Sequence, residues 1–143
     1  VETPKGPVVI DAGLPGQTDQ LADALAAHGL DLSAVRAVVL THHDGDHAGG
    51  LAAVCERAAD PVVYAHEAAA PYVDGREFPI KSDPDGERYE PVPIDVAVQD
   101  GVTFRTDAGP MRAVFNARAR SRAPRVPLPG VRRAPRGRRA PRR

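Results

Sequence analysis

The sequence has no tryptophan, only three tyrosines and three phenylalanines, and a single cysteine, Cys55. One cysteine cannot form an internal disulfide, which excludes a disulfide-stapled secreted domain and fits a reducing compartment. No apolar run approaches the roughly 20 residues that a membrane span needs, and no signal-peptide pattern opens the chain. We therefore expect a cytoplasmic protein without a membrane partner, while the missing initiator methionine leaves a lost leader segment open.

Acidic residues are absent from one part of the chain. The 19 basic and 19 acidic residues balance, but every acidic residue lies between Glu2 and Asp107. Residues 1–111 contain seven Lys and Arg against 19 acids, a formal charge of −12, and residues 112–143 contain twelve arginines and no acid. We predict a domain over residues 1–111, followed by a basic, disordered Arg/Pro-rich tail over 112–143 that cannot bury enough apolar surface to order itself.

The first part alternates between strand-like and helix-like segments. Short β-branched or apolar runs predict strands over 8–10, 35–40 and 61–65. Apolar residues at helical spacing predict one helix from a cap at Thr18 or Asp19 to Gly29, and another over 51–59. The polar, glycine-containing segment 41–50 is predicted to be a loop. This order is typical of an α/β fold.

The remaining segments of the first part give weaker signals. Residues 71–93 are rich in Pro, Gly and Asp and are interpreted as excursion loops. Residues 92–98 alternate weakly, and 102–105 are predicted to pair with them as a hairpin across Gln99-Asp100-Gly101.

The segment with the most informative chemistry is Thr41-His42-His43-Asp44-Gly45-Asp46-His47-Ala48-Gly49-Gly50. Five of these ten side chains can bind a metal, and the segment directly follows a predicted strand, where α/β proteins place their functional groups. Histidine and carboxylate ligands suit zinc, iron or manganese rather than calcium. A solvated loop with fortuitous histidines is the alternative, but three of the five histidines of the chain lie within six residues here.

These residues resemble a known family. The segment THHDGDHAGG is similar to the His-x-His-x-Asp-His signature of the metallo-β-lactamase superfamily, including the small-Gly-Gly helix start that follows it. VVIDAGLPG (8–16) resembles the preceding strand of that family, and VVYAH (62–66) resembles the strand after the motif helix. The likeness covers residues 1–107. It implies the first half of a metallo-β-lactamase-like αββα sandwich, hence an incomplete fold.

The resemblance also implies a ligand set. His42 and Asp44 would bind a first metal ion, and Asp46 and His47 a second one. Asp44 stands where the commonest family pattern has histidine, and a carboxylate at that position widens the choice of metal. The implied cofactors are two divalent metal ions, with zinc favoured and iron or manganese as alternatives. Asp46 is also the candidate catalytic residue, because it would steer the proton of the nucleophile.

Three further residues are assigned to the surroundings of this site. Asp11 is expected to orient a metal ligand, although a plain turn residue after a strand is nearly as good an interpretation. His43 occupies a variable position of the motif and is interpreted as a neighbour of the ligands. His66, at a strand end, is a candidate for the pocket wall or else a surface histidine. Cys55 is expected to be an ordinary buried thiol.

The activity implied by the family is hydrolysis of a small-molecule substrate, in which a metal-bound hydroxide attacks an ester, thioester, lactone, lactam or phosphoester. The family takes further ligands from a later Pro-Gly-His motif, a bridging Asp and a distal His. This sequence has no histidine after His66 and no acid after Asp107. We therefore expect the hydrolase to be truncated and impaired.

The arginine-rich tail admits two interpretations. If its codons are read one nucleotide later, with GC-rich usage, residues 116–126 allow a Pro-Gly-His segment and residues 134–140 allow a Gly-Asp segment. We therefore hypothesise a frameshift near residues 112–116. The alternative is a non-catalytic fragment whose tail binds nucleic acid or other polyanions without sequence specificity. Because a half-domain leaves a sheet face uncovered, self-association is also expected.

Overall fold

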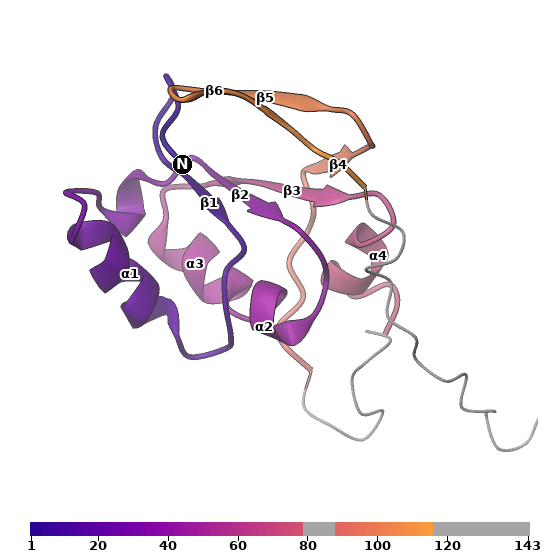
Figure 1. Cartoon of the computed structure of the whole chain (residues 1–143). Helices are drawn as coiled ribbons and strands as arrows, with labels where there is room; N and C mark the ends of the chain where they lie inside the picture. Colours follow the sequence, from indigo (N-terminus) through magenta and orange to yellow (C-terminus); the bar gives the residue numbers. More distant parts are fainter. Residues whose placement is uncertain (79–87, 116–143) are drawn as a thin grey trace, which may run out of the picture.

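Four short parallel strands form a sheet in the middle of the protein (Figure 1). The strands lie side by side in chain order: β1 (Val8–Ile10), β2 (Ala37–Leu40), β3 (Val62–His66) and β4 (Val96–Val98). The computed structural model describes residues 1–78 and 88–115, so the segment 79–87 and the predicted disordered tail from residue 116 onward lie outside the described residues. The predicted α/β class, with three strands at the expected places in the chain, is confirmed.

The helices pack on one side of this sheet (Figure 1). They are α1 (Thr18–Ala26), α2 (Gly45–Ala48), α3 (Leu51–Arg57) and α4 (Ala70–Val73), with a 3-10 turn at Leu32–Ala34. Within the described ranges, none of them has both the length and the apolar character to cross a membrane. The hydrophobic core lies between these helices and the sheet, where Val38, Leu51 and Val54 are fully buried.

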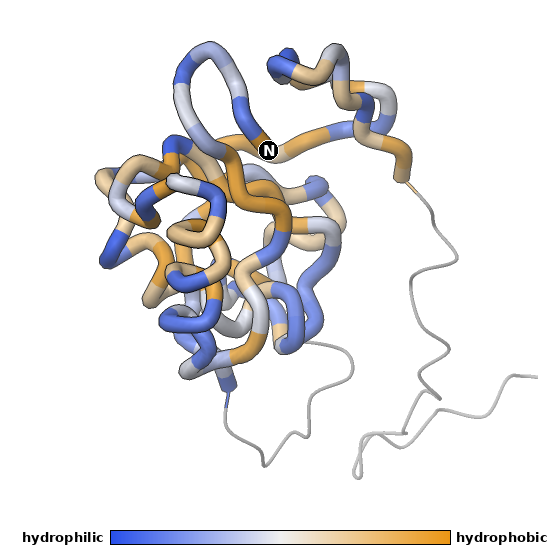
Figure 2. The backbone as a smooth tube through the Cα atoms, turned by 60° about the vertical axis from the view of Figure 1, so that its left-hand side comes forward, coloured by the Kyte–Doolittle hydropathy of each residue, from blue (hydrophilic) through white to orange (hydrophobic). Residues whose placement is uncertain are grey.

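The opposite side of the sheet is only partly covered. The register places Ile10, Val39, Tyr64 and Val96 in one row across the four strands. Ile10 is 37% exposed and Val96 is 39% exposed. Within β1, which the sequence predicts correctly as a strand, Val9 is the buried residue. The apolar strands still run through the middle of the body, as the orange stretches of Figure 2 show.

The hairpin of the structure joins other segments than the predicted one. β4 pairs in parallel with β3, whereas β5 (Thr103–Thr106) pairs antiparallel with β6 (Gly109–Arg112). The tight turn needed for that hairpin occurs before Gly109, whose φ of 114° is accessible to glycine. The hairpin of β5 and β6 lies over the partly covered side of the sheet, and Phe104 meets Tyr64 edge to face, with ring centroids 5.4 Å apart.

Three local expectations also differ from the structure. The excursion expected over 71–93 contains most of α4, which begins at Ala70. The loop expected over 41–50 contains the helical turn α2, because the amides of His47 and Ala48 both donate to the carbonyl of Asp44 at 2.9 Å. The start of α1 is not capped by Thr18 or Asp19, since the cap position is Gln17 and Thr18 is buried.

Candidate metal centre

The candidate site lies where the parallel strands β1 and β2 end. Asp11 follows β1 directly, and Thr41 to Asp44 follow β2. Because the carboxyl ends of parallel strands meet at one edge of a sheet, two segments 30 residues apart in the sequence become neighbours. The amide of Asp11 donates to the carbonyl of Val39 at 3.0 Å, which continues the pairing of the strands into the site.

Two glycines let the chain after β1 approach the helical turns of the motif. A Cβ atom at Gly49 would collide with the carbonyl oxygen of Gly45 and the ring of Pro15, and one at Gly50 would collide with the carbonyl oxygen of Ala12. The close approach is used, because the Ala12 amide donates to the carbonyl of His47 at 2.6 Å. These contacts hold α2, and hence His47, against the segment that carries Asp11.

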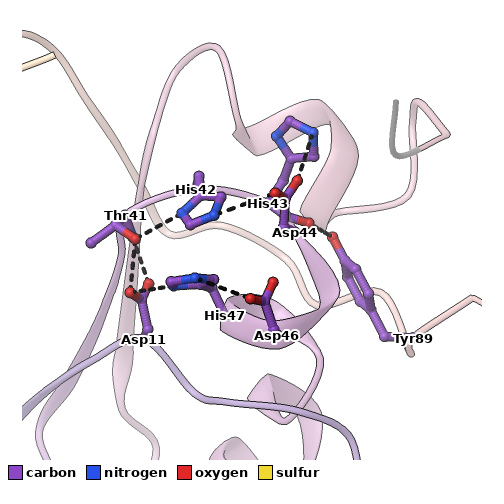
Figure 3. A network of polar contacts seen from close by, with 8 residues as sticks. All are labelled: Asp11, Thr41, His42, His43, Asp44, Asp46, His47 and Tyr89. Atoms are coloured by element: carbon purple, nitrogen blue, oxygen red, sulfur yellow. Dashed lines mark hydrogen bonds and ion pairs between the residues drawn. The ribbon is translucent and has the colours of Figure 1, made fainter. Parts of the chain in front are cut away.

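Three of the predicted ligands form a compact group. Atoms of His42, Asp46 and His47 that can bind a metal all lie within 4.8 Å of one another. The rings of His42 and His47 are 3.8 Å apart between centroids, and Nε2 of His47 lies 3.5 Å from Oδ2 of Asp46 (Figure 3). Two imidazole nitrogens and one carboxylate oxygen are a donor set that suits zinc. The residues present therefore fit a divalent metal.

The fourth predicted ligand, Asp44, is not part of that group of three. Its Oδ2 lies 3.4 Å from Nε2 of His42, and its side chain is 14% exposed. Asp44 is thus next to His42, while the compact group combines His42 with Asp46 and His47. This short distance is compatible with the pairing that the resemblance implies, in which His42 and Asp44 share one metal.

Asp11 is hydrogen-bonded to both sides of the site (Figure 3). Its Oδ1 accepts the backbone N–H of Thr41 at 2.8 Å. Its Oδ2 accepts the hydroxyl of Thr41 at 2.7 Å and lies 2.8 Å from Nδ1 of His47. The hydroxyl of Thr41 in turn lies 3.0 Å from Nδ1 of His42. Asp11 therefore contacts one histidine of the group directly and reaches the other through Thr41.

His43 points away from the compact group (Figure 3) and packs on an aromatic residue. Its ring stacks on Tyr72, with centroids 4.3 Å apart. The hydroxyl of Tyr89 donates to the backbone carbonyl of His43 at 2.8 Å. Burial is the main cause that raises the pKa of Tyr89 to about 12, and the negative charge of Asp44 acts in the same direction. Tyr89 is thus a neutral donor that anchors the motif loop at ordinary pH.

A cavity of about 430 Å³ adjoins the site between the partly covered sheet side and the hairpin. His42, His43, Asp44 and His66 provide polar groups, and much of the remaining lining is apolar. His66 therefore lies in a cavity wall. Its ring stacks on Phe115 with centroids 3.9 Å apart, and its Nδ1 accepts the amide of Ala68 at 3.1 Å.

Sequence reasoning missed the roles of Thr41, Tyr72 and Tyr89. Thr41 was visible as the first residue of the motif segment, but a hydroxyl next to a histidine carries no specific signal. Tyr72 and Tyr89 come from the Pro/Gly-rich part of the chain and had no signal at all. Cys55 is half-buried on α3 and outside the metal group, and burial raises the pKa of its thiol.

Comparison with known proteins gives one consistent result. The family profile described as "Metallo-beta-lactamase superfamily" matches residues 1–117. A solved metallo-β-lactamase of Cronobacter sakazakii, described by a HARLDQ motif, is 28% identical with a TM-score of 0.70, over 80% of this chain and 42% of that one. A β-lactamase of Chitinophaga pinensis is 26% identical with a TM-score of 0.65, over 73% and 39%.

A third solved structure is similar at the level of the fold. The subclass B3 metallo-β-lactamase of Bradyrhizobium japonicum has a TM-score of 0.70 at 23% identity, over 80% of this chain and 43% of that one. The present chain thus spans less than half the length of each of these solved relatives.

Proposed function

Because the chain belongs to the metallo-β-lactamase superfamily, we propose that it is a metal-dependent hydrolase whose metal is bound by His42, Asp46 and His47. The observation that carries this proposal is the convergence of their ligand atoms within 4.8 Å at the carboxyl end of the sheet. Two imidazoles and one carboxylate suit zinc and also iron, and zinc is the metal that we propose, with iron or manganese as alternatives. When bound, the metal would supply an activated water and polarise the bond under attack.

The chain's own residues have separate tasks in this proposal. His42 and His47 would hold the metal, and the second carboxylate oxygen of Asp46 would accept a proton from the attacking water. The Asp46 side chain is 64% exposed, so solvent can take up that proton. The cavity of about 430 Å³ accepts a small-molecule substrate, with His66 in its wall. An ester, thioester, lactone, lactam or phosphoester is the proposed substrate class.

We also propose that hydrolysis by this chain is impaired. A catalytic zinc normally has three protein ligands and a water, and the compact group offers three ligands, which is enough for one ion only. Asp44 lies beside His42 and would begin a second site. No histidine follows His66 and no acid follows Asp107, so a second ion has few further ligands. A cytoplasmic location belongs to the same proposal, and the single cysteine is compatible with it.

The frameshift hypothesis remains part of this proposal. The family match ends at residue 117, close to the inferred shift near residues 112–116. Sequencing the coding DNA across codons 105–143 and translating all three frames tests the hypothesis. A neighbouring frame that encodes both the Pro-Gly-His and the Gly-Asp segments supports it, and a DNA sequence that cannot encode them rejects it.

The test of the metal site is a zinc titration of the metal-free chain by calorimetry, followed by a hydrolysis panel of the five substrate classes. We expect about one zinc ion per chain, and weak binding by both His42→Ala and Asp46→Asn. The matched controls are His28→Ala and Asp23→Asn, two exposed residues on and after α1. Site variants that bind zinc as well as the controls do would reject the site.

The second candidate function follows from the charge distribution. Residues 112–143 contain twelve arginines and no acid, a composition that binds phosphate groups with a strong salt dependence. In that case the chain is a non-catalytic fragment that binds nucleic acid or another polyanion. Tight DNA binding that weakens steeply with salt, together with a failed zinc titration, would favour this function over hydrolysis.

A further inference from the structure

We infer that the Thr41 hydroxyl and the Asp11 carboxylate together fix one tautomer in both histidines of the metal group. This makes Thr41 a positioning residue, which acts through His42. The inference rests on the proposed metal site for its effect on zinc affinity. The tautomers themselves can be measured in the metal-free chain.

The first step is the placement of protons around Asp11. An ionised carboxylate only accepts hydrogen bonds. Oδ2 of Asp11 lies 2.7 Å from the Thr41 hydroxyl and 2.8 Å from Nδ1 of His47. Both neighbours must therefore donate, so the hydroxyl proton points at Asp11 and Nδ1 of His47 carries a proton.

The second step concerns His42. The Thr41 hydroxyl has one proton, and that proton is already directed at Asp11. Towards Nδ1 of His42, 3.0 Å away, the hydroxyl oxygen can only accept. Nδ1 of His42 therefore carries a proton as well. In the neutral ring, this leaves the lone pair of His42 on Nε2.

The two Nε2 atoms are the ones that face the other ligands. Nε2 of His42 lies 3.4 Å from Asp44, and Nε2 of His47 lies 3.5 Å from Asp46. A metal-binding histidine commonly donates its other ring N–H to a carboxylate or a similar acceptor, which fixes the tautomer. Here one carboxylate serves both rings, one of them directly and the other through a hydroxyl.

The backbone at Asp11 supports a specific role for this carboxylate. Asp11 has a φ of 59°, in the left-handed region that residues other than glycine seldom adopt. Such conformations cost free energy and tend to occur at functional sites. The conformation is held by the amide of Asp11, which donates to Val39, and by the amide of Ala12, which donates to His47.

Three variants separate the contribution of the Thr41 hydroxyl from that of the Asp11 carboxylate. Thr41→Val removes the hydroxyl but keeps the shape and the backbone N–H, so only His42 should lose its fixed tautomer. Thr41→Ser keeps the hydroxyl and should behave as the wild type. Asparagine is accommodated at the positive φ of position 11. In Asp11→Asn, the Thr41 backbone N–H should hold the oxygen of the side-chain amide in the place of Oδ1.

In Asp11→Asn, the amide nitrogen then replaces Oδ2 and donates where the carboxylate accepted. One of its protons would go to the Thr41 hydroxyl, which then donates to Nδ1 of His42. The other would go to Nδ1 of His47. Both rings should therefore switch to the tautomer with the proton on Nε2, which is the wrong one for the metal.

The measurement is long-range ¹H–¹⁵N NMR of the histidine side chains in the full chain, with metal removed and at a pH where the rings are neutral. A zinc titration of the same samples follows. We expect Nδ1–H on both rings in the wild type and in Thr41→Ser. In Thr41→Val, zinc affinity should fall about 10- to 100-fold. His28, outside the site, is the internal reference and should not change.

The inference is overturned if His42 keeps Nδ1–H in Thr41→Val, if Thr41→Ser behaves as Thr41→Val does, or if Asp11→Asn leaves both tautomers unchanged. An altered tautomer with unaltered zinc affinity would overturn the role of Thr41 as a positioning residue for the metal. Should Thr41→Val fail to fold, Asp11→Asn and Thr41→Ser decide the matter. If the tautomers respond as expected but the wild type binds no zinc, the proposed function fails and the fixed tautomers stand.

Discussion

The two glycines after α2 allow a sharp test of how the site is assembled. Gly49 and Gly50 lie where the chain after β1 passes closest to the motif, and an added Cβ atom at either position would overlap backbone atoms or the Pro15 ring. We therefore expect Gly49→Ala and Gly50→Ala to destabilise the protein. A backbone carbonyl cannot rotate away as the end of a flexible side chain can, so the segments must separate.

The expected size follows from the cost of overpacking. Forcing an extra methyl group into a packed position typically costs about 1–3 kcal/mol, and each kcal/mol lowers Tm by roughly 4–8 °C in a domain of this size class. Zinc affinity should fall as well. The separation would strain the hydrogen bonds from Gly50 to the Gly13 carbonyl at 2.9 Å and from Ala12 to the His47 carbonyl at 2.6 Å, which keep His47 near Asp11.

The matched control is Gly45→Ala in the same motif. A Cβ atom at Gly45 would meet only Tyr89 Cδ1, at an ordinary 4.0 Å, and Gly45 is the first residue of α2. Alanine favours a helix over glycine by up to about 1 kcal/mol, so this variant should be neutral or slightly more stable. Thermal and urea unfolding of the three variants measure the contrast. If Gly50→Ala is as stable as Gly45→Ala, the reasoning from close approach is refuted.

Two further predictions concern Tyr89 and the partly covered sheet side. Tyr89→Phe removes the hydrogen bond to the His43 carbonyl and should cost about 0.5–1.5 kcal/mol, with Tyr64→Phe as the control. Because the folded pKa of Tyr89 is raised to about 12 from 10, its stabilising contribution is complete below pH 10 and is lost as the pH rises towards 12. Between pH 10 and pH 12, the urea midpoint should therefore fall less in Tyr89→Phe than in the wild type. An equal fall in both proteins would contradict the assignment. The exposed apolar residues of the sheet should cause concentration-dependent association in sedimentation, which Val62→Lys reduces and Leu14→Lys, in the loop after β1, does not. A wild type that stays monomeric at high concentration would argue against association through the sheet.

The sequence alone was sufficient for the chemistry of the motif. His42, Asp46 and His47 lie within six residues, and a strand followed by a helical turn is a local structure. The spacing of these residues therefore places their side chains close together almost independently of the rest of the chain. The same holds for the class of fold, because β1, β2, β3, α1 and α3 follow from runs and periods within short segments.

The tertiary structure decided everything that depends on contacts between distant segments. The carboxylate of Asp11 reaches Thr41 and His47 across 30 and 36 residues, and the Tyr89 hydroxyl reaches the His43 carbonyl across 46 residues. The hairpin expected between 92–98 and 102–105 was wrong for the same reason, because β4 pairs with β3 across 32 residues in register. The local sequence pattern determines which side chains a segment carries. Which partners they meet depends on how the strands are ordered in the sheet, and no short window of the sequence contains that order.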